Sequence, residues 1–310
     1  MSFVPCELHC HTLHSDGSFT VSELQTAAKN ENLRLIALTD HNTFSGQQEL
    51  DDSIIPAIRG IEWTTYFGHM LVLGLNEFVD WRDAVPDNID EKILAVRNGG
   101  GIVGVAHPFQ LGSPMCTGGR WEFNVKKWEN VNYIEIWHQE FSPDNYENEK
   151  ATEFWKSLLD RGYRIAASYG RDWHRPCSGR YGFTLLDIDG EVNPENALEA
   201  VSKGRTVVSA GPEFYFTVKQ GQNESRIGET VKSTVTDFKF YLSNRTDIKC
   251  TKIKVVTNGN TVAAECDADK KNITLSLKEN SWYICELWGV LDSTEQPVAI
   301  TSPIYTGGKS

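Results

Sequence analysis

The chain has 310 residues, of which 40% are hydrophobic and 23% are charged, and its formal net charge is −12. These values are ordinary for a globular protein and leave room for one large or two ordinary domains. The acidic balance argues against binding of long nucleic acid, which needs a basic surface. A small, anionic substrate steered by metal ions is compatible with it.

No apolar run is long enough to span a membrane, so the sequence predicts no membrane association. The first residues do not resemble a signal peptide, and seven cysteines occur without a CxxC pair. Reduced thiols in the cytoplasm are therefore the simplest expectation. The oligomeric state is left open.

Residues 7–17 read ELHCHTLHSDG and place three histidines and an aspartate close together: His9, His11, His14 and Asp16. On a strand, His9 and His11 point to the same side because they lie two residues apart. Neutral imidazole and carboxylate groups are common ligands of zinc, iron and manganese. A histidine-rich surface loop is the simpler alternative, so the remaining ligands must be sought elsewhere in the chain.

Up to about Gly211, short apolar runs alternate with helical stretches. Runs such as LRLIALT, GIVGVAH, NYIEIWH and YRIAAS predict strands, and VSELQTAAKNEN and NEKATEFWKSLLDRG predict helices. Thr20 or Ser22 is expected to cap the first of these helices. Such alternation is typical of an α/β fold with a parallel sheet or barrel.

After Gly211 and Pro212 the helical periodicity ends. Short runs such as FYFTVKQG, DFKFYLSN, TKIKVVTNG and SWYICELWGVL, separated by turn residues, predict a small all-β sandwich. We therefore expect two domains, residues 1–211 and 212–310. No histidine follows His174, so the second domain is expected to supply no metal ligand and to serve packing or dimerisation.

Further candidate ligands end or follow separate apolar runs in the first domain. In β/α barrels, catalytic groups gather at the C-terminal ends of the strands, so residues far apart in sequence meet at one mouth. A single such histidine would be explained by packing, but repeated occurrences favour a metal centre. The candidates are His41, Glu62, His107, His138, Asp172 and His174.

The motifs HCHTLHSDG, TDHNT, GIEWTT, AHP and GRDWHRP occur in this order and resemble those of the PHP superfamily, the polymerase and histidinol phosphatase superfamily. The segment GHMLVLGL and the closing WYICELW and VAITSPIY resemble its carbaryl hydrolase-like branch. The resemblance implies a distorted (β/α)7 barrel, followed here by the β-sandwich. It also implies two or three divalent ions, zinc, iron or manganese.

The resemblance further implies which residues hold these ions. The first two implied sets share Glu62, which bridges their ions: His9, His11, Glu62 and Asp172 hold the first ion, and Glu62, His107 and His138 hold the second. The last set either completes a third site or serves the second ion: Asp16, His41 and His174. The sequence departs from the family pattern at Arg171, where serine is usual, and at His138, where many relatives have asparagine or another residue.

A hydroxide bridging two such ions attacks phosphorus in the phosphoesterases of this family. We therefore expect a metal-dependent hydrolase of a small phosphate ester or nucleotide. An ester, carbamate or amide hydrolase on the same ions is the alternative. A binding protein with an inert metal barrel is a third possibility.

Four arginines near the expected strand-end loops favour phosphate, because guanidinium binds it in a bidentate way. They are Arg120, Arg171, Arg175 and Arg180, and surface ion pairing is the alternative for each. Beside Glu62, the histidines His14 and His69 are candidates for protonating a leaving group or contacting substrate. The alternatives are an exposed loop residue for His14 and a hydrogen bond within the barrel wall for His69.

Overall fold

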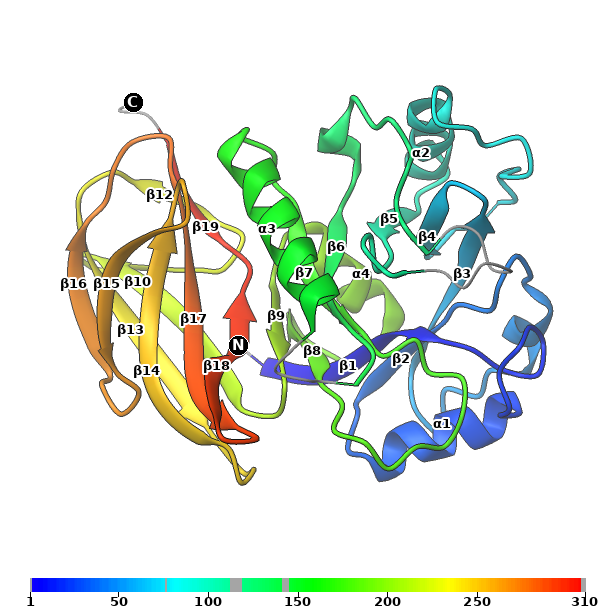
Figure 1. Ribbon diagram of the computed structural model, residues 1–310, viewed down its shortest axis with the longest axis horizontal. Coiled ribbons are helices and arrows are strands. Elements are labelled where there is room, and N and C mark those ends of the chain that lie inside the picture. The colour runs from blue at the N-terminus through cyan, green and yellow to red at the C-terminus, as the bar shows by residue number, and fades with distance from the viewer. Residues whose placement is uncertain (1, 76, 112–118, 141–144, 308–310) are drawn as a thin grey trace.

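The computed structural model describes residues 2–75, 77–111, 119–140 and 145–307, which form two parts lying side by side (Figure 1). The part drawn from blue to green combines helices and strands, whereas the part drawn from yellow to red is built from strands. This arrangement confirms the expectation of a mixed α/β region followed by a large β-rich region.

The first part contains most of the helices and the strands that carry the candidate ligands. Its strands are β1 (Ser2–Cys10), β2 (Leu35–Leu38), β3 (Ala57–Thr65), β4 (Gly68–Leu73), β5 (Ile102–Val105), β6 (Tyr133–His138), β7 (Ala166–Gly170), β8 (Phe183–Ile188) and β9 (Thr206–Ser209). Its helices are α1 (Val21–Asn30), α2 (Ile89–Asn98), α3 (Tyr146–Asp160) and α4 (Pro194–Ser202), with short 3-10 helices η1 (Ser45–Glu49) and η2 (Trp128–Asn130).

The second part consists of strands joined mainly by short turns, and its pairs are antiparallel except for β12 and β19, which are parallel. They are β10 (Glu213–Gln220), β11 (Asn223–Arg226), β12 (Thr230–Lys232), β13 (Val235–Ser243), β14 (Lys249–Thr257), β15 (Thr261–Asp267), β16 (Asn272–Ser276), β17 (Trp282–Leu291), β18 (Thr294–Thr301) and β19 (Ile304–Gly307). Strands β11, β10, β13 and β16 form a separate sheet. Its buried Phe238 meets Tyr283 of β17 edge to face, so two sheets pack against each other here.

Strands β1 to β7 are neighbours in chain order. The pairs β1–β2, β2–β3, β5–β6 and β6–β7 are parallel, whereas β4 runs antiparallel to both β3 and β5. The regular alternation expected from the sequence is interrupted at this point. Only Tyr66 and Phe67 separate β3 from β4, which is too short for the crossover that a parallel pair requires. An isolated parallel bridge between Cys10 and Trp173 links β1 to the segment after β7.

Helix α1 begins directly after the loop that carries the histidine cluster. The Thr20 hydroxyl accepts a hydrogen bond from the backbone N–H of Glu23, and the Glu23 carboxylate accepts one from the N–H of Thr20. This reciprocal capping box satisfies two backbone donors that a helix start leaves free. The predicted cap is thus Thr20 rather than Ser22, and it fixes where the loop ends.

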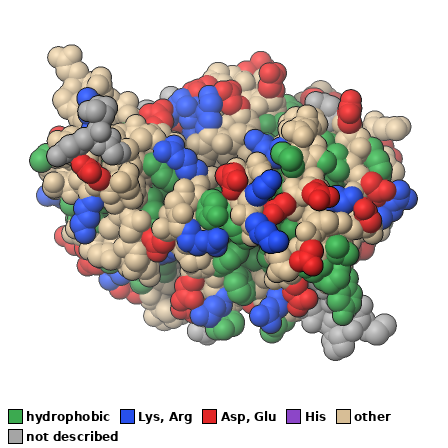
Figure 2. Space-filling view, turned by 90° about the horizontal axis from the view of Figure 1, so that it is seen from above, with side chains coloured by type: hydrophobic (Ala, Val, Ile, Leu, Met, Phe, Trp, Pro, Cys, Tyr) green, Lys and Arg blue, Asp and Glu red, His purple; other side chains and the backbone are tan. Residues whose placement is uncertain are grey.

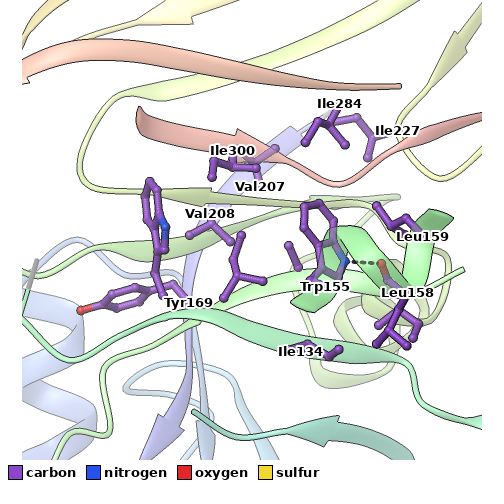
Figure 3. Close-up of a cluster of buried hydrophobic side chains, with 14 of the residues drawn as sticks. Ile134, Trp155, Leu158, Leu159, Tyr169, Val207, Val208, Ile227, Ile284 and Ile300 are labelled. Carbon is purple, nitrogen blue, oxygen red and sulfur yellow. Dashed lines mark hydrogen bonds between the residues drawn. The ribbon is translucent and has the colours of Figure 1, made fainter. Parts of the chain in front are cut away.

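The two parts share one sheet and one hydrophobic core. Strand β9 pairs with β8 on one side and with β18 on the other, so the sheet continues from the first part into the second. Figure 3 shows the cluster at this junction, where Trp155 of α3 lies among apolar side chains of both parts. Its indole N–H donates to the carbonyl of Ile165 at 2.8 Å. The proposed boundary after residue 211 therefore follows β9 directly and crosses a continuous core.

Charged side chains of both signs are interspersed over the molecule on the face that Figure 2 shows. None of the helices in the described ranges is long and apolar enough to cross a membrane.

A chain ending at residue 211 would retain every candidate ligand but lose β17 and β18. We expect this fragment to lack a cooperative thermal transition, because Trp155, Val207 and Val208 would lose their apolar neighbours. Circular dichroism melting curves of the fragment and the full chain provide the measurement. A fragment that melts cooperatively at the temperature of the full chain would show instead that the two parts fold independently.

Candidate metal centre

The candidate ligands meet because each follows or ends a neighbouring strand. Strand β1 ends at Cys10, and its alternation turns Cys10 away while His9 and His11 face the interior. Both histidine side chains are fully buried, as is Glu62 near the end of β3. The residues His107 after β5 and His138 at the end of β6 are 3% and 5% exposed, so they too lie within the protein.

A first set of four ligand atoms converges from β1, β3 and the segment after β7. The Nε2 atom of His9 lies 3.2 Å from Oε2 of Glu62 and 3.3 Å from Oδ1 of Asp172. The Nε2 atom of His11 lies 3.4 Å and 3.0 Å from the same two oxygens. His9, His11, Glu62 and Asp172 thus form one group, as the resemblance implied.

The spacing of these atoms fits a shared metal ion. Two ligand atoms on one tetrahedral ion, each about 2.0–2.1 Å from it, lie about 3.3 Å apart. All four atoms of the first set are buried, and none has a hydrogen-bond partner among the described residues. Because buried polar groups are normally hydrogen-bonded, four such atoms facing one another point to a bound cation. The residues present therefore fit the implied metal.

A second set shares the two carboxylates of the first. The other oxygen of Glu62, Oε1, lies 3.3 Å from Nε2 of His107, and Oδ2 of Asp172 lies 3.2 Å from Nε2 of His138. His107, His138 and Asp172 form a common group of candidate ligands. Each oxygen of Glu62 therefore faces a different set, which is the arrangement of a carboxylate that bridges two ions.

A third set lies nearer the surface. The Oδ1 atom of Asp16 lies 3.4 Å from Nε2 of His41 and 3.0 Å from Nε2 of His174. The rings of His41 and His174 both stack on His11, with centroids 4.2 Å and 4.1 Å from it. The third set is thus in direct contact with the first, and the structure brings together all nine residues that the sequence predicted as ligands.

Two of these ligands have strained backbone. His107 has a φ of 25° and Asp172 a φ of 52°, and two residues that directly follow ligands, Asn42 and Gln139, have φ values of 53° and 55°. Non-glycine residues adopt positive φ at a cost, and such strain is frequently found at functional sites. The surrounding structure therefore holds two ligands in conformations that an isolated chain would avoid.

The loop that presents Asp16 is held by a residue that the sequence analysis overlooked. Asp40 accepts hydrogen bonds from the backbone N–H of Thr12, the hydroxyl of Thr12 and the hydroxyl of Ser15, at 2.6, 2.7 and 2.8 Å. Gly17 lies so close to the loop that a Cβ atom there would stand 2.6 Å from the carbonyl carbon of His11. The glycine of the SDG motif therefore permits a close backbone approach.

Two buried glutamates were also missed. Glu7 lies two residues before His9 and accepts its backbone N–H at 2.9 Å, and burial raises the pKa of Glu7 to about 8. Glu135 lies in the middle of β6 and is 1% exposed. The available signal was the acidic residue inside the apolar run YIEIWH, and for Glu7 the period-two spacing with His9 and His11.

The two histidines proposed for catalysis are placed differently. The Nδ1 atom of His69 donates a hydrogen bond to Oε1 of Glu62 at 2.8 Å, and its Nε2 atom has no hydrogen-bond partner among the described residues. Both ring nitrogens of His14 are engaged outside the ligand sets, with the hydroxyl of Ser45 at 2.8 Å and the carboxylate of Glu49 at 3.0 Å. His69 thus contacts the site, whereas His14 forms hydrogen bonds to the two ends of η1.

Two of the four arginines are engaged in contacts of their own. The Arg171 side chain is buried, and its guanidinium donates to Glu31 at 2.5 Å and to Cys177 at 3.2 Å. It also lies 3.8 Å from the ring centroid of Trp173, and its two terminal nitrogens are both engaged, which argues against substrate binding. Arg180 pairs with Asp247 at 3.3 Å. The remaining two are exposed: Arg120 and Arg175.

The electrostatics of the centre favour a carboxylate that stays ionised. Burial opposes the charge of Glu62, but the positive charge of His9 and the hydrogen bonds from His107, His41 and His69 together outweigh it and hold the pKa of Glu62 well below its ordinary value. Burial alone would lower the pKa of His9, yet the charges of Glu135, Glu62 and Asp172 raise it well above normal. Without metal, the centre therefore holds protons that a cation would displace.

Residues 7–85 match the family model of the PHP domain, a segment that includes His9, His11, Asp16, His41 and Glu62. Together with the ligand sets, this match supports the PHP superfamily and a metal-binding hydrolase. The search of curated proteins found no match.

One solved structure with a TM-score above 0.5 is similar to this chain in fold. A Bacteroides vulgatus two-domain protein containing a predicted PHP-like metal-dependent phosphoesterase is 14% identical, with a TM-score of 0.55, over 97% of this chain and 95% of its own. At that identity the likeness concerns the fold alone, and it spans both parts of the molecule.

Two other solved structures are more distant. A proposed metal-dependent phosphoesterase from Bifidobacterium adolescentis is 17% identical, with a TM-score of 0.38, over 55% of this chain and 87% of its own. An amidohydrolase from Chromobacterium violaceum is 18% identical, with a TM-score of 0.39, over 64% of this chain and 96% of its own. These scores are too low to bear on the fold of this chain.

In metal-free protein, we expect stability to fall as the pH rises from about 6.5 to 9. Burial alone would lower the pKa of His174, but its hydrogen bond to Asp16 and the charge of Asp172 raise it to about 9. A raised histidine pKa stabilises the fold fully below the unfolded value of about 6.5, and this contribution is lost as the pH passes the folded value. Melting temperatures in chelator across this range measure the effect.

The control for this prediction is His174→Asn, which should show a shallower fall than the wild type. The hydrogen bond from His174 lowers the pKa of Asp16 to about 2, so Asp16 stays charged throughout this range and does not contribute to the change. A wild-type melting temperature that rises between pH 6.5 and 9 in chelator would contradict the prediction.

Glu62→Gln keeps the size of the bridging side chain and removes its charge. We expect it to weaken binding of at least one ion by about 10-fold or more, the scale seen when even supporting groups of metal sites are lost. Metal content after dialysis against a competing chelator provides the measurement. Glu49→Gln removes a half-exposed carboxylate outside the three sets and should keep the wild-type content. Equal content in both variants would exclude Glu62 as the bridge.

Proposed function

We propose that this chain is a metal-dependent phosphoesterase that acts on a small phosphate ester or nucleotide. The observation that carries the proposal is Glu62, whose two oxygens face separate sets of ligand atoms. The PHP match over residues 7–85 and the convergent histidine and carboxylate groups support the broader class of metal-dependent hydrolases. A two-ion site of this kind suits displacement at phosphorus.

The chain would hold the ions through the three ligand sets described above, and zinc, iron and manganese all suit imidazole and carboxylate donors. Bound divalent ions would lower the pKa of water and neutralise charge that develops on a phosphoryl oxygen. The protein fixes its own groups around them. His69 donates to Glu62, and the hydroxyl of Thr64 lies 2.5 Å from Nδ1 of His41, so both rings are held in a fixed orientation.

His69 is the side chain we propose to handle the proton of the leaving group. Its Nδ1–H is used by Glu62, and its Nε2, which is buried and has no hydrogen-bond partner among the described residues, is the nitrogen we propose to take part. The ring is 6% exposed and lies between His41 and His107, with centroids 5.9 Å and 5.0 Å away. His14 is a weaker candidate because Ser45 and Glu49 occupy both its ring nitrogens. Among the arginines, exposed Arg120 and Arg175 remain proposals for binding phosphate.

An ester, carbamate or amide hydrolase on the same ions is the alternative. It is supported by the segment 68–75, which resembles the carbaryl hydrolase-like branch and forms β4 with His69 near its start. The ligand sets do not distinguish attack at phosphorus from attack at a carbonyl carbon. A binding protein with an inert centre is disfavoured because the ligand set is complete.

The finer points of architecture and location belong to the same proposal. We propose that β1–β7 form the distorted barrel of the superfamily, which the bridge between Cys10 and Trp173 supports. A β-sandwich would follow from residue 212, and it contributes no residue to the candidate ligand groups among the described residues. The six described cysteines are free thiols, which suits the proposed cytoplasmic location.

A substrate panel tests the proposed reaction. Purified protein loaded with Mn²⁺, Fe²⁺ or Zn²⁺ is assayed on a phosphomonoester, a phosphodiester, a carboxylester and a carbamate. We expect hydrolysis of a phosphate ester, reduced at least about 10-fold by Glu62→Gln because the bridge is lost. Turnover restricted to carboxylesters or carbamates would favour the alternative. Loaded protein that turns over none of them would favour the inert binding protein.

A further inference from the structure

Glu135 is a carboxylate buried beneath the candidate metal centre. It projects from the middle of β6 and is 1% exposed. An ionised carboxylate is costly to bury unless it is paired and hydrogen-bonded. Its two oxygens are both engaged, and both partners belong to residues that also supply candidate metal ligands.

The two hydrogen bonds reach different strands. Oε1 of Glu135 accepts from the Nδ1–H of His9 on β1 at 2.9 Å, and Oε2 accepts from the backbone N–H of His107, after β5, also at 2.9 Å. These distances are those of ordinary N–H···O hydrogen bonds. Glu135 forms a possible ligand group with His9 and His107, but its Oε2 is taken by a backbone N–H and its Oε1 by Nδ1 of His9, not by the Nε2 that faces the first set. We therefore assign Glu135 to the support of the ligands.

The bond to His9 determines which ring nitrogen is free. A neutral imidazole carries one N–H and one lone pair, and Nδ1–H is committed to Glu135. The lone pair is then on Nε2, the atom that faces Glu62 and Asp172 in the first set. A carboxylate behind a histidine in this way fixes the ring and strengthens it as a ligand.

The bond to His107 supports strained backbone. His107 has a φ of 25°, a conformation that L-residues seldom adopt without help from their surroundings. The N–H that Glu135 accepts belongs to the residue in that conformation, and the same residue directs Nε2 at Glu62. One carboxylate thus holds one ligand of the first set and one of the second.

A glycine leaves room for this carboxylate. A Cβ atom at Gly170, the last residue of β7, would stand 2.0 Å from Oε1 of Glu135. The backbone here has little freedom to move away, because Gly170 pairs with His138 of β6 and its carbonyl accepts from the N–H of Gln139 at 2.9 Å. Any larger side chain at position 170 would displace either the carboxylate or the ligand.

We propose that Glu135, in the space provided by Gly170, is a positioning residue that sets His9 and His107 for binding two ions. The proposal rests on the metal centre proposed above. It predicts that changing Glu135 weakens metal binding without removing any ligand. It also predicts that Gly170→Ala acts in the same direction, although it alters neither a ligand nor a charge.

The test is a competition titration of metal-free protein with Zn²⁺ against a chromophoric chelator, so that no substrate is needed. Glu135→Gln can still accept from His9, but its amide N–H then faces the N–H of His107. We expect Zn²⁺ affinity to fall about 10–100-fold, and Gly170→Ala to lower it as well. Glu286→Gln is the matched control. It changes another buried carboxylate, which pairs with Lys156 at 2.7 Å and touches no ligand, so Zn²⁺ affinity should stay at the wild-type value.

Melting temperatures without metal separate folding from positioning. Similar losses of stability in Glu135→Gln and Glu286→Gln, with weaker metal binding only in the first, would support the proposal. Wild-type affinity in Glu135→Gln would overturn it. If that variant does not fold, Gly170→Ala decides in the same titration, and unchanged affinity there overturns the proposal. A wild-type protein that binds no Zn²⁺, Mn²⁺ or Fe²⁺ would instead refute the metal centre itself.

Discussion

One buried carboxylate, Glu62, organises the centre. Its two oxygens lie within 3.4 Å of ring nitrogens from five histidines: His9, His11, His41, His69 and His107. A negative charge with no exposure to solvent is tolerable only where positive charge surrounds it, whether that charge is carried by protons or by metal ions. The strand ends around Glu62 are therefore constrained electrostatically as well as by packing.

Much of this centre could be predicted from sequence because its ligands follow a simple rule. His41, Glu62, His107 and Asp172 each stand at the end of a recognisable apolar run, and strand order brings such ends together. The β-rich region could be predicted equally well, since turn residues recur between short alternating runs. The antiparallel β4 was less so, because a run of apolar residues does not reveal the direction of its strand.

What the sequence did not reveal depends on long-range geometry. Glu135 and Asp40 act through backbone N–H groups of distant residues, and no spacing in the chain marks such contacts. Arg171 seemed available for phosphate because it precedes Asp172, but Glu31 and Trp173 enclose it. The direction of a side chain in a loop is decided by its neighbours in space. A list of candidate ligands is thus more predictable than the residues that support them.

The sheet shared through β9 has a consequence for the order in which the chain is made. Every candidate ligand has been synthesised once residue 174 is added, yet the edge of β9 is covered only when β18, residues 294–301, arrives. Until then the growing chain exposes an unpaired strand edge beside Val207 and Val208, the kind of edge that invites pairing with other chains. The nascent chain thus spends the synthesis of the whole β-rich part with its metal ligands present and its sheet unfinished.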